Sequence, residues 1–187
     1  MKKIAYIFIL GSLMSCISKQ PEPRKPVSYS SGSFLEESAA KNKKIVAAEK
    51  KAIFQIIEDN EEAEYQNSPD GFWYTYENKS NLNDTIYPQK GDLVVFEYNL
   101  LNLKGDTLYS KEDIGVREYY IDEEQIFTGL RQGLKLMQEG ETITFLFPSY
   151  KAFGYYGDLE RIGGNVALQS TITLKSINQT KNQLNKN

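Results

Sequence analysis

The spacing of hydrophobic and polar residues divides the chain into a helical first part and a β-rich second part. Between Ser33 and about Tyr65, apolar residues recur at rough helical spacing among lysines and acids, which predicts one long helix. Ser33 and Glu36 have the spacing of a capping box, so we place the start of this helix at Ser33. Two uses of its apolar face stay open: packing on its own domain, and pairing with a second copy of the chain.

A turn signal at residues 67–71, Asn-Ser-Pro-Asp-Gly, ends the helical pattern. Residues 72–76 are aromatic or β-branched, and residues 94–100 carry an apolar residue at every second position; both runs are typical of strands. Further strands are predicted by apolar residues an even number of positions apart: Ile143, Phe145, Phe147, Leu168, Ile172 and Leu174. Leu130, Leu134 and Met137 predict one short helix over residues 128–137. We therefore expect an α+β fold, in which an antiparallel β-sheet wraps over one short α-helix and follows an N-terminal helix.

The first 32 residues have the pattern of a leader and a spacer. Lys2 and Lys3 precede an apolar run over residues 4–10, the layout of an export signal, and the run is shorter than the about 20 residues of a membrane-spanning helix. The segment Leu-Met-Ser-Cys that ends at Cys16 resembles the lipobox of bacterial prolipoproteins. We expect a signal peptide at 1–15, lipidation of Cys16 and a flexible spacer over 16–32. The chain would then be lipid-anchored in the cell envelope and face the periplasm, with the inner or outer membrane left open.

Composition removes most kinds of catalytic chemistry. The 187 residues include no histidine and one cysteine, which excludes Ser/His/Asp and Cys/His machinery, a disulfide within the chain and a zinc site built on His or Cys. The net charge of −3 and the absence of a basic stripe argue against nucleic acid as a partner. The acidic run Asp122, Glu123 and Glu124 lacks the spaced oxygen ligands of a cation site and is expected to be a solvated loop. We expect neither a metal nor a cofactor.

Four segments of the second half, in order and at the right spacing, carry a family resemblance. They are Val-Phe-Glu-Tyr at 95–98, Gly-Asp-Thr-Leu-Tyr-Ser at 105–110, Ile-Phe-Thr-Gly-Leu-Arg-Gln-Gly-Leu-Lys-Leu-Met-Gln-Glu-Gly-Glu at 126–141 and Ala-Phe-Gly-Tyr-Tyr-Gly at 152–157. Together they resemble the FKBP family of peptidyl-prolyl cis-trans isomerases over residues 88–177, about half of the chain. The expected organisation is an N-terminal helix at 33–67, an FKBP-type domain at 68–178 and a disordered tail at 179–187.

The resemblance implies a pocket for a prolyl ring. Its substrate-contacting residues would be Tyr98, Leu108, Tyr109, Ile126, Phe127, Leu130, Phe153 and Ile162. By the same resemblance, the backbone N–H of Phe127 would donate to the substrate carbonyl that precedes the proline.

Several positions depart from the family pattern. Tyr109 replaces an aspartate, Leu130 a tryptophan at the floor of the pocket, Phe153 a tyrosine and Ser170 a phenylalanine, while Gly163 and Gly164 replace a pair of prolines. The site is therefore expected to keep isomerase activity at a reduced level.

The implied function is isomerisation of X-Pro bonds in exported or cell-envelope polypeptides. The alternative is a weakly catalytic or non-catalytic binding module that holds proline-containing partner segments. The combination of lipobox, helix and divergent domain also resembles, more narrowly, the gliding-motility-associated isomerase lipoproteins of gliding bacteria. That match would make motility components the clients.

Overall fold

A computed structural model describes residues 31–80 and 86–180. The predicted signal peptide, Cys16 and nearly all of the predicted spacer lie outside the described residues. Of the described residues, those from 36 onward form one compact unit, which holds the sheet and the predicted pocket residues. No helix within the described ranges is long and apolar enough to cross a membrane.

The N-terminal helix, α2 (Ser31–Asp59), begins and ends earlier than the sequence predicts. Ser33 lies inside the helix and is therefore not its cap. The helix stops six residues before Tyr65, where the N–H of Ala63 donates to the carbonyl of Asn60 at 3.1 Å in a turn. Acidic residues crowd this end, and negative charge at a helix C-terminus opposes the helix dipole: Glu58, Asp59, Glu61, Glu62 and Glu64.

Eight strands in the described part of the chain form one antiparallel sheet, as the alternating pattern predicts. They are β1 (Gln66–Asn67), β2 (Trp73–Asn78), β3 (Leu93–Tyr98), β4 (Leu100–Asn102), β5 (Thr107–Tyr109), β6 (Arg117–Tyr120), β7 (Thr142–Phe147) and β8 (Leu168–Asn178). The order is β1-β2-β7-β8-β3-β6, and a β4–β5 hairpin joins the sheet through β8. Residues 66 and 67, expected at the end of the helix, thus belong to the sheet.

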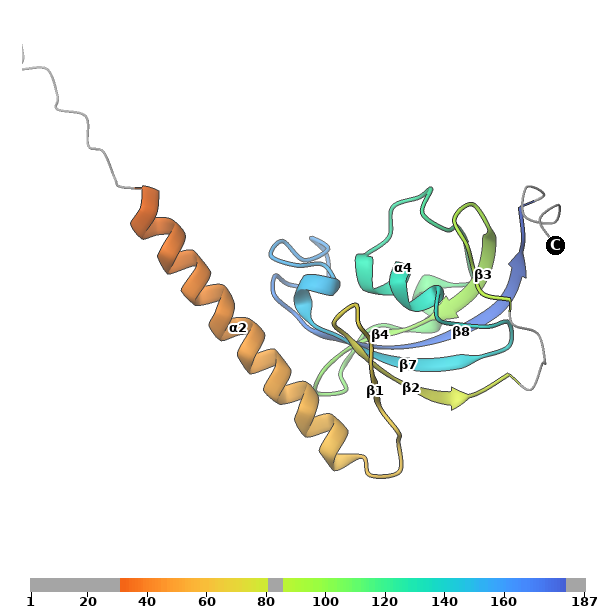
Figure 1. Cartoon of the computed structure of the whole chain (residues 1–187), viewed down its shortest axis with the longest axis horizontal. Coiled ribbons are helices and arrows are strands. Elements are labelled where there is room, and N and C mark those ends of the chain that lie inside the picture. The colour runs from red at the N-terminus through yellow and green to blue at the C-terminus, as the bar shows by residue number, and fades with distance from the viewer. Residues whose placement is uncertain (1–30, 81–85, 181–187) are drawn as a thin grey trace, which may run out of the picture. The chain divides into compact units, whose positions relative to one another are not determined.

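The core lies between the sheet and α4 (Thr128–Leu134), which Figure 1 shows over one face of the curved sheet, above β7 and β8. Leu130, Leu134 and Met137 are fully buried, as are Phe145 and Phe147 of β7. The helix is three residues shorter than predicted. Met137, the last apolar residue of the predicted helix, lies in a turn, where its N–H donates to the carbonyl of Leu134. The predicted helix–sheet contact is therefore confirmed with a shorter helix.

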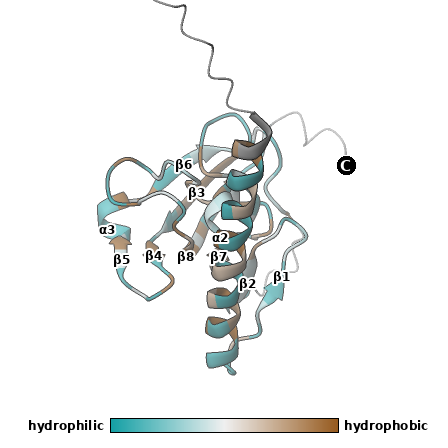
Figure 2. Ribbon diagram, turned by 90° about the vertical axis from the view of Figure 1, so that its left-hand side faces the viewer, coloured by the Kyte–Doolittle hydropathy of each residue, from teal (hydrophilic) through white to brown (hydrophobic). Residues whose placement is uncertain are grey.

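α2 packs on the sheet domain through the middle of its length. Ile53 is fully buried, and the ring of Phe54 lies 5.6 Å from that of Trp73 in an edge-on arrangement. Glu49 is also buried, and its Oε2 accepts a hydrogen bond from the N–H of Ser149 at 3.0 Å. Hydrophobic and hydrophilic stretches alternate along the helix in Figure 2, which fits its rough apolar face.

Two short helical turns and an anchored C-terminal residue were not predicted. α3 (Lys111–Ile114) begins with a complete capping box between Ser110 and Asp113, and η1 (Ser149–Lys151) follows β7. The tail expected from residue 179 is bound at its start, because the N–H of Thr180 donates to Oδ1 of Asp92 at 2.9 Å. Residues 181–187 lie outside the described ranges.

Candidate functional site

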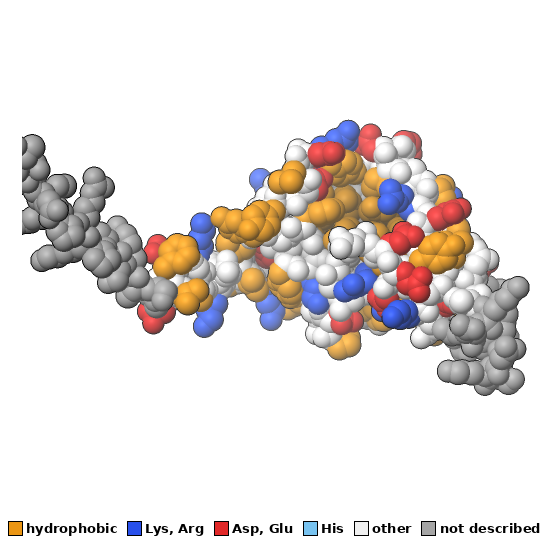
Figure 3. Space-filling view, turned by 90° about the horizontal axis from the view of Figure 1, so that it is seen from above, with side chains coloured by type: hydrophobic (Ala, Val, Ile, Leu, Met, Phe, Trp, Pro, Cys, Tyr) orange, Lys and Arg blue, Asp and Glu red, His pale blue; other side chains and the backbone are white. Residues whose placement is uncertain are grey.

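The structure brings all eight predicted pocket residues into two adjoining apolar clusters. Tyr98 and Phe127 pack against both, Ile126 and Leu130 belong to the larger one beneath α4, and the rest belong to the smaller one: Leu108, Tyr109, Phe153 and Ile162. Leu130 and Ile162 are 0% and 2% exposed, so they back the site, whereas the other six side chains keep part of their surface open. Figure 3 shows apolar side chains gathered in a hollow on the domain face seen from above.

Phe127 is the aromatic centre of this arrangement. Its ring lies 5.1 Å from the ring of Phe153 at 44°, and 5.6 Å from that of Phe147 in an edge-on contact. Phe127 precedes α4 and has extended backbone angles, φ −62° and ψ 145°. The two ring contacts place its side chain against the clustered residues.

Two polar groups at the site have no hydrogen-bond partner within residues 31–80 and 86–180. One is the backbone N–H of Phe127 and the other is the hydroxyl of Tyr98. The Tyr98 ring stacks on Phe96 at 5.5 Å. Burial raises the pKa of Tyr98, and Arg117 opposes this only in part, so the phenol is a neutral donor at ordinary pH. Both groups are donors that a bound carbonyl oxygen can use.

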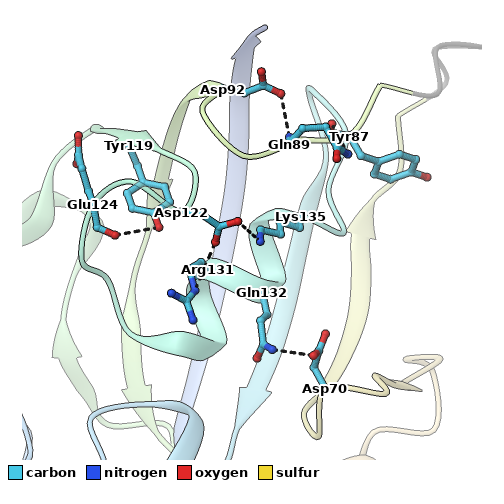
Figure 4. A network of polar contacts seen from close by, with 10 residues as sticks. All are labelled: Asp70, Tyr87, Gln89, Asp92, Tyr119, Asp122, Glu124, Arg131, Gln132 and Lys135. Atoms are coloured by element: carbon cyan, nitrogen blue, oxygen red, sulfur yellow. Dashed lines mark hydrogen bonds and ion pairs between the residues drawn. The ribbon is translucent and has the colours of Figure 1, made fainter. Parts of the chain in front are cut away.

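Polar contacts on both sides hold α4 and the residue that follows it, Lys135 (Figure 4). Asp122 forms ion pairs with Arg131, at 3.7 Å, and with Lys135, so this acid of the predicted solvated loop is bound to the helix. On the other side, the Gln132 amide donates to Asp70 Oδ1 at 2.6 Å. Within the described residues, no group of three or more acidic or Cys side chains is placed to hold a metal ion.

The hydroxyl of Tyr109 is already hydrogen-bonded within the protein. Its Oη donates to Oδ2 of Asp158 at 2.6 Å, and the guanidinium of Arg161 lies 4.7 Å from the centre of its ring. The hydrogen bond to Asp158, with burial and the negative charges of Asp158 and Glu160, raises the pKa of Tyr109 to about 12. Burial alone would raise the pKa of Asp158, but the hydrogen bonds that its carboxylate accepts outweigh burial and lower it.

Asp158 and Arg161 are site residues that the sequence reasoning missed. Asp158 follows the Ala-Phe-Gly-Tyr-Tyr-Gly segment directly, and its partner Tyr109 is 49 positions away in the chain. No spacing rule connects them. The available signal was chemical: the family's aspartate is missing at 109, while an unassigned aspartate occurs in a loop of the same site.

Comparisons with known proteins identify a family model and solved structures that the chain resembles. Residues 84–175 match the family model described as FKBP-type peptidyl-prolyl cis-trans isomerase. A peptidyl-prolyl cis-trans isomerase from Pseudomonas syringae pv. tomato is 19% identical, with a TM-score of 0.57 over 73% of this chain and 96% of that one.

FkpA from Escherichia coli is 20% identical, with a TM-score of 0.58 over 95% of this chain and 83% of that one. These two similarities establish the fold. No curated protein sequence matches the chain significantly. The family match covers residues 84–175, and these residues form a domain of the FKBP-type peptidyl-prolyl cis-trans isomerase family.

Proposed function

We propose that the domain isomerises X-Pro bonds in polypeptides exported to the cell envelope. The observation that carries the proposal is the N–H of Phe127, which has no hydrogen-bond partner among the described residues and lies beside a partly open aromatic cluster. A prolyl ring is apolar, and the carbonyl before it needs one donor, so the cluster and the N–H match the two ends of the same dipeptide.

The reaction needs no acid, base or metal. Rotation about a peptide bond has a barrier of about 18–20 kcal/mol, because twisting the amide breaks its resonance. Resonance places negative charge on the amide oxygen, which water stabilises, and the twisted form has less of that charge. A pocket that replaces water with apolar walls therefore favours the twisted amide over the planar one. This mechanism fits a chain without histidine.

Each group of the site has a defined task in this mechanism. The rings of Phe127 and Phe153 hold the prolyl ring, and the N–H of Phe127 orients the preceding carbonyl. The Tyr98 hydroxyl donates to a second substrate oxygen. The oxygen of the rotating amide has less negative charge in the twisted form, so only a hydrogen bond to another substrate oxygen can strengthen there. A gain of about 1 kcal/mol in such a bond accelerates the reaction about fivefold.

The activity is expected to be lower than that of a domain with the full family pattern. Phe153 has no hydroxyl to offer the substrate, the Tyr109 hydroxyl is bonded to Asp158, and Leu130 has less ring surface than tryptophan. The same features favour the alternative, a binding module that holds a proline-bearing segment. A prolyl-peptide isomerisation assay with a parallel binding titration separates the two: binding without acceleration would support the module.

The proposed location is the cell envelope, with a lipid on Cys16 and the domain facing the periplasm. The leader pattern and the lipobox-like segment support this, and both lie outside the described residues. Incorporation of labelled palmitate into the full chain, compared with Cys16→Ser, tests the anchor.

By the narrower resemblance, the clients would include gliding-motility components. Loss of gliding in a strain whose chromosomal copy carries Phe127→Ala would support that role.

Pairing of two copies through α2 stays a prediction. Val46 and Phe54 are each 40% exposed on a helix whose Ile53 is buried against its own domain. Sedimentation of the chain without residues 1–16, compared with its Val46→Lys variant, tests the pairing. A mass of one chain in both samples would contradict it.

A further inference from the structure

The loop at residues 157–163 is closed on itself by Asp158. The N–H of Asp158 donates to the carbonyl of Ile162 at 3.0 Å, and the N–H of Ile162 donates back to Oδ1 of Asp158 at 2.7 Å. The same oxygen accepts from the N–H of Glu160 at 2.9 Å. The backbone position of Ile162, one of the pocket residues, is therefore set by the carboxylate of Asp158.

The second oxygen of this carboxylate reaches out of the loop. Oδ2 of Asp158 accepts from the Tyr109 hydroxyl of β5 at 2.6 Å, a hydrogen bond strengthened by the charge on the acceptor. Glu160 Oε2 lies 3.3 Å from the same hydroxyl, as a longer second acceptor. One side chain thus ties the loop both to itself and to a strand of the pocket.

Arg161 makes a second link between the same two elements. Its Nη1 donates to the carbonyl of Leu108 at 3.2 Å and forms an ion pair with Asp113 at 2.9 Å. The backbones of Leu108 and Ile162, which share the smaller apolar cluster, are therefore each hydrogen-bonded to a side chain of this loop.

The loop has a backbone that needs such support. Leu159 has a φ of +67°, a left-handed conformation that is unfavourable for leucine and persists only where surrounding contacts hold it. Gly157 has a φ of +70°, and a Cβ there would lie 2.0 Å from the carbonyl oxygen of Ile162. The loop is thus tightly folded around the residue that backs the pocket.

We propose that Asp158 is a positioning residue of the isomerase site, which together with the Tyr109 hydroxyl holds Ile162 in place behind the prolyl pocket. The proposal rests on the proposed function for its effect on catalysis, and on geometry alone for the position of Ile162. Without the carboxylate, the loop relaxes away from Leu108 and the pocket loses a wall. The loss weakens binding of the planar and twisted substrate alike, so it raises KM more than it lowers kcat.

The kinetic test uses the chain without residues 1–16 and its variants Tyr109→Phe, Asp158→Asn and Asp158→Ala. Asn keeps an oxygen for the N–H of Ile162, so the expected order of kcat/KM is parent, then Asp158→Asn, then Asp158→Ala. We expect Tyr109→Phe to lower kcat/KM by about three- to tenfold, mostly through KM. The double variant Tyr109→Phe/Asp158→Ala should lose no more than Asp158→Ala alone, because both changes break one unit.

Tyr74→Phe is the matched control. It also removes a tyrosine hydroxyl that donates to a side-chain oxygen, Gln66 Oε1 at 2.9 Å, but on β2. It should leave kcat and KM unchanged. If Tyr109→Phe lowers kcat/KM no more than Tyr74→Phe does, the catalytic part of the proposal is overturned.

A second readout needs no catalysis. The isoleucine δ1-methyl groups are labelled, and NMR spectra are recorded without substrate. The Ile162 signal should shift or broaden in Tyr109→Phe and in Asp158→Asn, and should stay in place in Tyr74→Phe. An unmoved Ile162 signal in both variants would overturn the proposal whatever the kinetics show. A moved signal in a chain whose parent form does not isomerise would uphold the positioning role and reject the proposed function instead.

Discussion

The ring of Phe127 lies 5.1 Å from the ring of Phe153, at an interplanar angle of 44°. The first residue ends the segment that leads into α4, and the second lies in the loop after η1, so two separate elements meet in one aromatic wall. Phe153 is partly exposed, so the site is open to solvent at this side chain.

Phe153→Tyr should therefore raise activity. The substitution keeps the ring contact and returns the hydroxyl that the family pattern has at this position. One additional hydrogen bond of about 0.5–1.5 kcal/mol in the twisted state would raise kcat/KM about two- to tenfold. A peptide isomerisation assay measures the change, with the thermal midpoint as a check that the fold is unaltered. No gain in kcat/KM would mean that this side chain does not face the substrate.

Tyr98→Phe should have the opposite effect. The hydroxyl has no partner within the described residues, so its loss leaves no protein group unsatisfied, and the stack on Phe96 is retained. We expect kcat/KM to fall about two- to tenfold with a stability change below about 0.5 kcal/mol. Full activity in this variant would remove Tyr98 from the site.

Gly129→Ala should be strongly destabilising. A Cβ at Gly129 would lie 2.5 Å from Cδ1 of Phe147 and 2.9 Å from the carbonyl oxygen of Lys151, so α4 would have to move off β7. Overpacking of this kind costs about 1–3 kcal/mol. Gly133→Ala is the milder comparison, because its nearest contact is a ring atom of Phe145 at 3.0 Å. Urea unfolding that ranks Gly133→Ala below Gly129→Ala in stability would contradict this account of the helix–sheet contact.

Glu49 should matter through hydrogen bonding more than through charge. It is buried on α2, its Oε2 accepts from the N–H of Ser149, and its Oε1 has no partner within the described residues. Glu49→Ala should cost about 1–3 kcal/mol, because it leaves the buried N–H of Ser149 unsatisfied. Glu49→Gln keeps an acceptor and removes a buried charge, so it should be closer to the parent. The exposed Glu37→Ala serves as control, and equal losses in all three variants would refute this role.

The contact between Tyr109 and Asp158 should persist over a wide pH range. The pKa of Tyr109 is raised from 10.0 to about 12, so its stabilising effect is complete below pH 10 and is lost as the pH rises toward 12. The pKa of Asp158 is lowered from 3.8 in the folded chain, so the stabilising effect of its carboxylate is complete above pH 3.8. This effect is lost as the pH falls through the lower pKa of the folded state.

Tyrosinate absorbance tests the alkaline side. Tyr76 also has its pKa raised to about 12, first by burial and then by neighbouring charge, so Tyr76 and Tyr109 are expected to titrate in the same range. Tyr109→Phe should remove one of these two titrations, and Asp158→Asn should move the pKa of Tyr109 toward its ordinary value. A parent chain whose Tyr109 titrates at the ordinary value would show that the hydrogen bond is absent in solution.

The sequence predicts the sheet and the helix beneath it because side-chain alternation is a direct consequence of strand geometry. Positions 94 and 96 on β3, and 143, 145 and 147 on β7, are buried as expected. Helix ends were less predictable, since they depend on local charge and capping. The box of Ser110 and Asp113 in α3 was visible in the sequence but lies within a stretch of only four helical residues.

The candidate pocket residues were named from the family resemblance, and the fold brings them together. Asp158 and Glu49 were not, since their partners Tyr109 and Ser149 lie 49 and 100 positions away in the chain. Such contacts depend on how loops cross the sheet, which residue patterns along a single chain do not encode.

The most direct measurement of the central claim is the rate of cis–trans isomerisation of a proline-containing peptide with and without the chain, expressed from residue 17. The account predicts acceleration that depends on the concentration of the chain, rises in Phe153→Tyr and falls in Tyr98→Phe. A rate equal to that of buffer at every concentration, from protein shown to be folded by its thermal transition, would contradict it.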